Sequence, residues 1–237
     1  PQLPPLTQET RLVPPSDEQQ SMDIANRRIM QSIIGKSHIS EMDLLRLRKA
    51  MTNCRMAADC TSLVDAQGPE SSGKLEELKS LLEQVCAQGE HKLLIFSEWS
   101  RMLDKIEVLL AILEIPFVRI DGKCSARHRE QALQSFNTQD EIQVMLCCSG
   151  AAVGLNLQQA DTVINVDVPW NPAKMEQRLA RAHRYGQEKP VQVINLVTSG
   201  TIEERLLLNF EKKQELFSAI LDPDTDICEV SMSGGMG

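Results

Sequence analysis

A regular alternation between residues 92 and 220 limits the fold of this chain more than any other feature. Short apolar runs alternate there with amphipathic stretches of helical period. Strands that are apolar on both faces indicate a parallel sheet buried between two layers of helices. The predicted fold class is therefore α/β, with a doubly wound, mainly parallel sheet and helices on both faces. The expected strands are residues 92–96, 117–120, 142–148, 162–166 and 191–197, and the expected helices are residues 101–113, 125–136, 172–185 and 202–220.

The first third of the chain has a different pattern. Five prolines within residues 1–16 predict an extended lead-in, and two helices are expected after it, with Gly35 between them. A polar stretch then predicts a linker before the next helix. The expected helices are residues 17–34, 40–54 and 74–87, and the expected linker is residues 61–73. We therefore divide the chain into a helical lead-in and linker (1–73), an α/β domain (74–221) and an acidic tail predicted to be mobile (222–237).

Composition narrows the classes of function. The net charge of −8 argues against a general polyanion binder, and residues 91–200 carry 12 basic and 12 acidic side chains, so any DNA contact is expected to be local. The seven cysteines form no C-x-x-C pair, which supports neither a zinc site nor a disulfide framework and predicts a reduced intracellular compartment. No apolar run approaches a membrane span, so no membrane partner is expected.

One phosphate-loop motif is a false match. Gly35, Lys36 and Ser37 look like the end of such a loop, but Met30 stands where its first glycine is needed, and a helix precedes it instead of a strand.

The stretch MEQRLARAHRYGQ, residues 175–187, carries three arginines at a spacing of three: Arg178, Arg181 and Arg184. On a helix Gln177 would share one face with Arg181 and Arg184. Guanidinium groups gathered on one face suit phosphate oxygens, although a solvated basic face is the simpler alternative. A second face would pack inward through Met175, Leu179 and Ala182.

Four segments in order carry a family resemblance: LIFSEW, RIDGKCSARHRE, GLNLQQADTVINVDVPWNP and QRLARAHRYGQ. Together they resemble the second RecA-like lobe of a superfamily 2 helicase, specifically the Swi/Snf-like DNA-dependent ATPases, over residues 74–221. The resemblance implies a RecA-like sheet in an ATP-driven translocase on double-stranded DNA. It also implies that an N-terminal lobe, absent from this chain, supplies the phosphate loop and the magnesium ligands. The chain is then the C-terminal part of a longer motor and is expected to be inactive alone.

The resemblance also assigns roles around the nucleotide. Arg181 and Arg184 match the arginines that reach across the cleft between the lobes to ATP phosphates, with Gln177 nearby. Gly154 matches the loop that senses nucleotide. ATP and Mg²⁺ are expected to be bound mainly by the other lobe, and none in the isolated fragment. Possible nucleoprotein partners are implied, with a nuclear location in a eukaryote and a cytoplasmic one in a bacterium.

Five residues match DNA-contacting positions of the family: Trp170, Asn156, Asp121, Gly122 and Arg129. Prolines stiffen the Trp170 loop, and a stiff exposed aromatic suits stacking or groove insertion. Each residue has a simpler alternative: a tryptophan packed under its own loop, a strand-to-helix turn, a turn glycine, and an exposed helix arginine.

The chain departs from the family before Gly154. Cys148, Ser149, Ala151 and Ala152 stand where a hydroxyl, a basic residue and paired glycines are usual, which weakens the expected DNA grip of this loop. Two other functions were weighed. A nucleotide-free DNA- or protein-interaction module would not need the arginine pattern, and a dinucleotide-binding oxidoreductase would need a G-x-G-x-x-G that follows no strand here.

Overall fold

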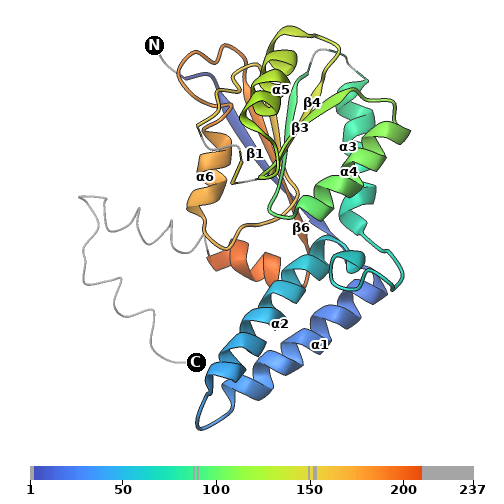
Figure 1. Ribbon diagram of the computed structural model, residues 1–237, viewed down its shortest axis with the longest axis vertical. Coiled ribbons are helices and arrows are strands. Elements are labelled where there is room, and N and C mark those ends of the chain that lie inside the picture. Colours follow the sequence, from blue (N-terminus) through green and yellow to red (C-terminus); the bar gives the residue numbers. More distant parts are fainter. Residues whose placement is uncertain (1–2, 88, 90, 149, 152–153, 210–237) are drawn as a thin grey trace, which may run out of the picture.

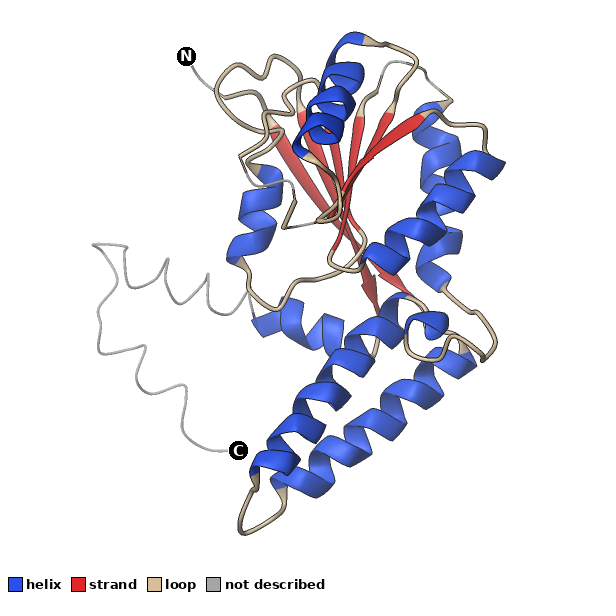
Figure 2. Cartoon of the chain, in the orientation of Figure 1, coloured by secondary structure: helices blue, strands red, loops and turns tan. Residues whose placement is uncertain are grey.

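The computed structural model describes residues 3–87, 89, 91–148, 150–151 and 154–209 (Figures 1 and 2). Residues 202–209 are also helical, and the rest of the helix expected to reach residue 220, like the tail at 222–237, lies outside the described residues. The strands are β1 (Leu6–Val13), β2 (Leu93–Ser97), β3 (Phe117–Ile120), β4 (Val144–Cys148), β5 (Thr162–Asn165) and β6 (Val191–Thr198). The helices are α1 (Asp17–Ile34), α2 (Glu41–Asp59), α3 (Gly73–Cys86), α4 (Ser100–Ile112), α5 (Ala126–Thr138) and α6 (Ala173–Leu179), with a short 3₁₀ turn at Thr61–Leu63.

The six strands form one sheet in the order β1-β6-β5-β2-β4-β3, and every neighbouring pair is parallel. The predicted parallel sheet is therefore confirmed, and β2, which is buried at every position, lies inside it. Because all strands run the same way, the segments that follow them meet at one edge of the sheet.

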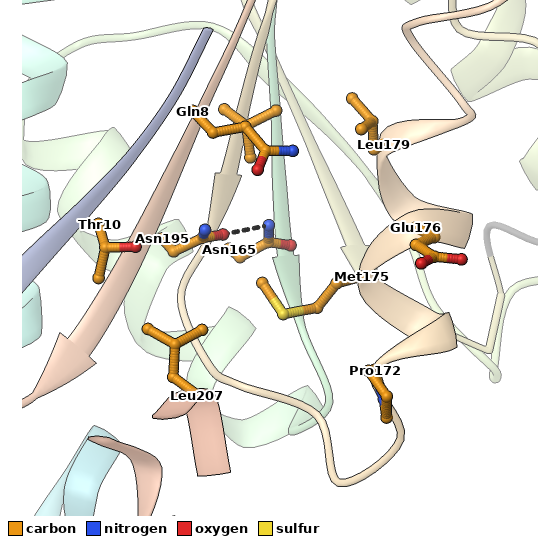
Figure 3. Close-up of a pocket in the computed structure, with 10 residues that line it drawn as sticks. Gln8, Thr10, Asn165, Pro172, Met175, Glu176, Leu179, Asn195 and Leu207 are labelled. Atoms are coloured by element: carbon orange, nitrogen blue, oxygen red, sulfur yellow. Dashed lines mark hydrogen bonds between the residues drawn. The ribbon is translucent and has the colours of Figure 1, made fainter. Parts of the chain in front are cut away.

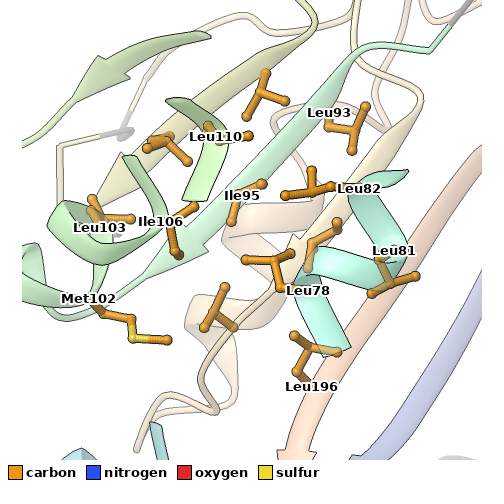
Figure 4. Close-up of a cluster of buried hydrophobic side chains, with 14 of the residues drawn as sticks. Leu78, Leu81, Leu82, Leu93, Ile95, Met102, Leu103, Ile106, Leu110 and Leu196 are labelled. Carbon is orange, nitrogen blue, oxygen red and sulfur yellow. The ribbon is translucent and has the colours of Figure 1, made fainter. Parts of the chain in front are cut away.

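Alternate residues of each strand pack on opposite faces of the sheet. Leu93 and Ile95 of β2 face the cluster covered by α3 and α4 (Figure 4). Leu94 and Phe96 face a second cluster, which α5 covers together with the chain around Ala182. Complete burial of one such leucine contributes roughly 1.5–3 kcal/mol. Helices therefore cover both faces, as the doubly wound class predicts.

The predicted extended lead-in is in fact a strand of the sheet. β1 pairs along its whole length with β6, from Leu6 beside Val191 to Val13 beside Thr198. Its side chains are mostly exposed because it is an edge strand, so no apolar run marked it in the sequence.

The segment predicted as a linker, residues 61–73, is packed into the fold. Thr61, Ser62 and Leu63 are buried, and the Thr61 hydroxyl donates to the carbonyl of Pro69 at 2.6 Å. The helices before it form a hairpin, α1–α2 (Figure 1). Ser16 caps α1, and α2 continues to Asp59 beyond the predicted end at residue 54.

α6 ends at Leu179, whereas the sequence pattern predicted a helix to residue 185. Tertiary contacts take the carbonyl groups that would have continued it. The Leu157 amide donates to the carbonyl of Arg181 at 3.1 Å, and the Gln187 side chain donates to that of Ala182 at 3.1 Å. Among the described residues, no helix is both long and apolar enough to cross a membrane.

Candidate functional site

Arg181 lies beyond α6, in the turns over residues 180–186. Its guanidinium group donates to the carbonyls of Gln177 at 3.0 Å and of Leu155 at 3.5 Å. The second contact places Arg181 against the loop over residues 154–158, which holds Gly154 and Asn156. The structure thus brings together two segments that are 26 residues apart in the chain.

Glycines shape both sides of this contact. Gly154 has a φ of +81° and Gly186 a φ of +95°, a backbone region that other residues rarely adopt. A Cβ atom on Gly186 would lie 2.8 Å from the Gln158 side chain, which also donates to the carbonyl of Tyr185. A Cβ on Gly154 would meet nothing within 4 Å, so this backbone is open to a ligand. Asn156 is exposed, and its side chain donates to Gln158 at 3.2 Å.

Arg184 is exposed, and within the described part of the chain its side chain makes no hydrogen bond or ion pair. Gln177 is exposed as well. Since a guanidinium group carries five N–H donors, Arg184 can offer its full fork to an anion. The prediction that Gln177, Arg181 and Arg184 share one helical face is wrong, because α6 ends before Arg181. The two arginines nevertheless remain on the same short segment.

Arg178 has a different environment from the other two arginines. It is 2% exposed, and it donates to Asp167 Oδ1 at 2.9 Å, to Asn165 Oδ1 at 3.0 Å and to the Asp167 carbonyl at 3.0 Å. It also lies over the Phe96 ring, 5.6 Å from the centroid. Although burial opposes the charge, Arg178 holds the pKa of Asp167 below its ordinary value. Arg178 therefore anchors the segment that carries the other two arginines.

The sequence contained a signal for this anchor. Residues 175, 178 and 182 share one helical face, so Arg178 lies on the apolar face that includes Met175 and Ala182. A charged residue on a buried face needs a buried partner. Asp167, directly after the apolar run of β5, is that partner.

Trp170 lies between β5 and α6 and is 48% exposed. The chain on either side is fixed. Asp167 Oδ2 accepts the Ser97 hydroxyl at 2.6 Å and the Glu98 amide at 2.7 Å, while Asn171 accepts the amide of Ala173 at 3.1 Å. Trp170 is therefore half exposed on a segment, residues 168–174, whose backbone is held on both sides.

The three expected DNA-contacting residues near β3 differ in how far solvent reaches them: Asp121, Gly122 and Arg129. The Asp121 carboxylate is buried, pairs with Arg119 at 2.8 Å and accepts the Lys123 amide at 2.8 Å. Burial opposes the charge, yet these contacts hold the pKa of Asp121 below its ordinary value. The carboxylate therefore shapes its own turn. Gly122 is exposed with open space around it, and Arg129 is half-buried.

The predicted residues lie at opposite ends of the sheet. Trp170 and Asp121 follow β5 and β3 at the carboxyl edge, where two strands separate them, or roughly 14 Å at ordinary strand spacing. The arginine segment lies near the amino edge, since the Gln187 side chain donates at 2.9 Å to Ala160, just before β5. α6 connects the two places.

Sequence reasoning missed a buried charge cluster at the carboxyl edge. Lys74 is fully buried and contacts Asp59 at 2.7 Å, Glu203 at 2.5 Å and the Val166 carbonyl at 2.6 Å. Burial raises the pKa of the Asp59 carboxyl well above its ordinary value. The cluster joins α2, α3 and the helix over residues 202–209, so it fastens the N-terminal hairpin to the sheet.

Part of the site suits ATP, and none of the described part suits a metal. Arg184 with free donors and the open Gly154 backbone fit phosphate oxygens. Within the described residues no group of three or more His, Cys, Asp or Glu side chains is arranged to hold a metal ion. The exposed donors of Arg184 therefore fit the phosphate oxygens of a nucleotide.

A cavity of about 310 Å³ lies beside α6 (Figure 3). Amide side chains from three strands line it, with Asn165 donating to Asn195 at 2.8 Å, opposite Met175 and Leu179 of α6. Arg178 donates to the side-chain oxygen of the same Asn165, so the buried anchor and the cavity share this residue.

Known proteins resemble this chain in sequence. The family model described as "Helicase conserved C-terminal domain" matches residues 73–186. The chromatin-remodeling ATPase INO80 of Mus musculus is 38% identical over 174 residues, which cover 69% of this chain and 11% of that protein. The SWI/SNF-related matrix-associated actin-dependent regulator of chromatin subfamily A member 1 of Homo sapiens is 33% identical over 206 residues, covering 81% of this chain and 20% of that protein. The chain thus spans a fifth or less of these two relatives.

Solved structures share the fold. The C-terminal part of the Fun30 ATPase domain superposes with a TM-score of 0.74 at 21% identity, covering 87% of this chain and 90% of that one. The Sulfolobus solfataricus SWI2/SNF2 ATPase core in complex with dsDNA gives a TM-score of 0.76 at 23% identity, covering 93% of this chain and 47% of that one. Fold and arginine segment together define a helicase-type C-terminal lobe. The chain belongs to the SWI2/SNF2 family of ATPases.

Proposed function

We propose that this chain is the C-terminal lobe of an ATP-dependent translocase on double-stranded DNA. The observation that carries the proposal is the pair Arg181 and Arg184 on an exposed segment, beside the open Gly154 backbone, with the buried Arg178 as anchor. A solvated basic face would not need a buried ion pair to hold it in place.

ATP, bound with Mg²⁺ mainly by the other lobe of the same polypeptide, supplies the phosphoryl group when the lobes meet. Arg184 then donates to phosphate oxygens, and Arg181 adds a second positive charge while its contact with Leu155 keeps it beside the Gly154 loop. Fixed donors stabilise charge that develops in the transition state more than charge in bound ATP. Gln177 lies one turn before Arg181 and helps to orient the nucleotide.

The DNA surface is proposed at the carboxyl edge, from the segment around Trp170 to Gly122 and Arg129. Asn156, on the loop beside the arginine segment, is proposed as a separate DNA contact. One of the superposed structures contains double-stranded DNA, which supports duplex DNA as the track. Both named relatives act on chromatin by name, so a nucleoprotein target and a nuclear location are part of the proposal for a eukaryotic source.

Purified residues 1–237 alone should not turn over ATP, whereas the intact motor should do so with stimulation by duplex DNA. Turnover by the chain alone would contradict the role of a half-site. An intact protein that turns over no ATP, with or without DNA, would favour the alternative, a nucleotide-free interaction module on the same fold.

A further inference from the structure

Trp170 lies in the segment over residues 168–174, which we call the Trp170 arc. Both ends of this arc are linked to the carboxylate of Glu98, one through Arg55 and the other through Lys174. We propose that Arg55 and Glu98 are positioning residues that set the place of Trp170 against DNA. Through Arg55, which belongs to α2, the α1–α2 hairpin becomes part of the DNA-engaging apparatus. The inference rests on the proposed function, because it takes Trp170 as a DNA contact.

Arg55 holds the first end of the arc. Its Nη2 atom donates to the Val168 carbonyl at 3.1 Å and also contacts the Glu98 carboxylate, while the guanidinium lies 5.2 Å from the centroid of the Trp99 ring. The side chains of Arg55 and Glu98 are only 12% and 13% exposed. Solvent screens such a pair much less than a surface ion pair.

Lys174 holds the second end. Its Nζ atom lies 2.6 Å from Glu98 Oε1, on the carboxylate that Arg55 contacts through Oε2. The Glu98 backbone amide is itself bound by Asp167 at 2.7 Å. Glu98 therefore links Lys174 to Arg55, and Arg55 contacts Val168. Trp170 lies between these two ends, at the exposed middle of the arc.

A contact of this kind needs preorganisation. An indole that stacks or inserts must be presented in one place, and an arc free to move would lose conformational entropy on binding DNA. Removing Arg55 frees the Val168 end and leaves Glu98 with one cationic partner. The expected outcome is a more mobile Trp170 and weaker DNA binding, without a change in the arginine segment.

Tryptophan fluorescence tests this directly, because the chain has two tryptophans, Trp99 and Trp170. In a Trp99→Phe background, which keeps an aromatic face beneath Arg55, Trp170 is the sole emitter. Arg55→Ala in the full chain should raise acrylamide quenching of Trp170 about twofold and lower its anisotropy, as expected of faster local motion. It should raise the Kd for a short DNA duplex by about three- to tenfold.

Controls separate positioning from folding. Arg48→Ala, an exposed arginine on the same helix, should change neither signal. Glu98→Gln is nearly isosteric, so it tests the tie even if Arg55→Ala unfolds the chain. Arg55→Lys should restore little, since a single ammonium reaches Glu98 and the Val168 carbonyl together less well than a guanidinium fork. Unchanged quenching and anisotropy in both folded variants, Arg55→Ala and Glu98→Gln, would overturn the inference. A Trp170→Ala variant that binds DNA normally would instead overturn the proposed DNA contact.

Discussion

Replacing Arg178 with alanine should destabilise the lobe far more than replacing either neighbouring arginine. Arg178 and Asp167 are 2% and 1% exposed and meet at 2.9 Å, so the change leaves a buried carboxylate without its cation. Removing one partner of a buried pair costs about 3–5 kcal/mol. For a domain of this size that corresponds to a fall in Tm of roughly 6–20 °C. Arg184→Ala should stay within about 0.5 kcal/mol, as is usual for an exposed side chain.

Arg178→Ala should also change how the stability of the lobe depends on pH. The folded-state pKa of Asp167 is depressed by Arg178, so its contribution to stability is present above the unfolded pKa and is lost as pH falls through the folded value. Arg178→Ala should remove that contribution. Without that cation burial raises the folded pKa, although the Ser97 hydroxyl and the Glu98 amide still donate to Asp167, so the stability gained as pH rises through the ordinary carboxyl range should shrink. Urea unfolding of parent and variant across that range measures both effects, and a double-mutant cycle with Asp167→Asn isolates the pair. An Arg178→Ala variant within 1 kcal/mol of the parent would refute the anchoring role.

Three further outcomes are expected. Gly186→Ala should lower stability by roughly 1–3 kcal/mol, because φ is +95° and the new Cβ would lie 2.8 Å from Gln158; unchanged urea unfolding would contradict the loop geometry. Burial raises the pKa of the Cys147 thiol to about 12, so iodoacetamide at pH 8 should modify it only after unfolding, as peptide mass mapping would show. The hydrogen bond from Lys36 lowers the pKa of Asp43 to about 2, so that carboxyl should titrate by NMR well below an ordinary aspartate; Lys36→Met should raise it, and its contribution to stability should be present above pH 4 and lost toward pH 2.

The sheet could be predicted because its central strands are apolar on both faces. β3 was predicted with its observed bounds, and β2 and β6 within one residue at each end. β1 was missed because an edge strand keeps polar side chains, and its pairing with β6 crosses almost the whole chain. Local sequence carries no information about a partner so distant.

The local structure around the expected site residues differs from the one that the sequence predicted. Spacing alone placed Arg181 and Arg184 on a helix, and it could not show that Leu157 and Gln187 would divert the carbonyls of Arg181 and Ala182. The buried tie of Lys74 was missed because it joins segments far apart in the chain. The tie of Arg178 spans only 11 residues and was missed although Arg178 lies on the apolar helical face. Glu98 lay in a quoted segment, yet its link to Arg55 depends on how α2 packs.

Turnover by an Arg184→Ala variant of the intact motor tests the central claim most directly. With Arg46→Ala as the exposed-arginine control, DNA-stimulated ATP turnover should fall on the order of a thousandfold, or about 4 kcal/mol, while ATP binding and the melting temperature stay near those of the parent. Arg184→Lys should rescue little, because a point charge cannot fork across two oxygens. Turnover near the parent rate in a folded Arg184→Ala motor would show that this guanidinium faces solvent and would contradict its role at the nucleotide.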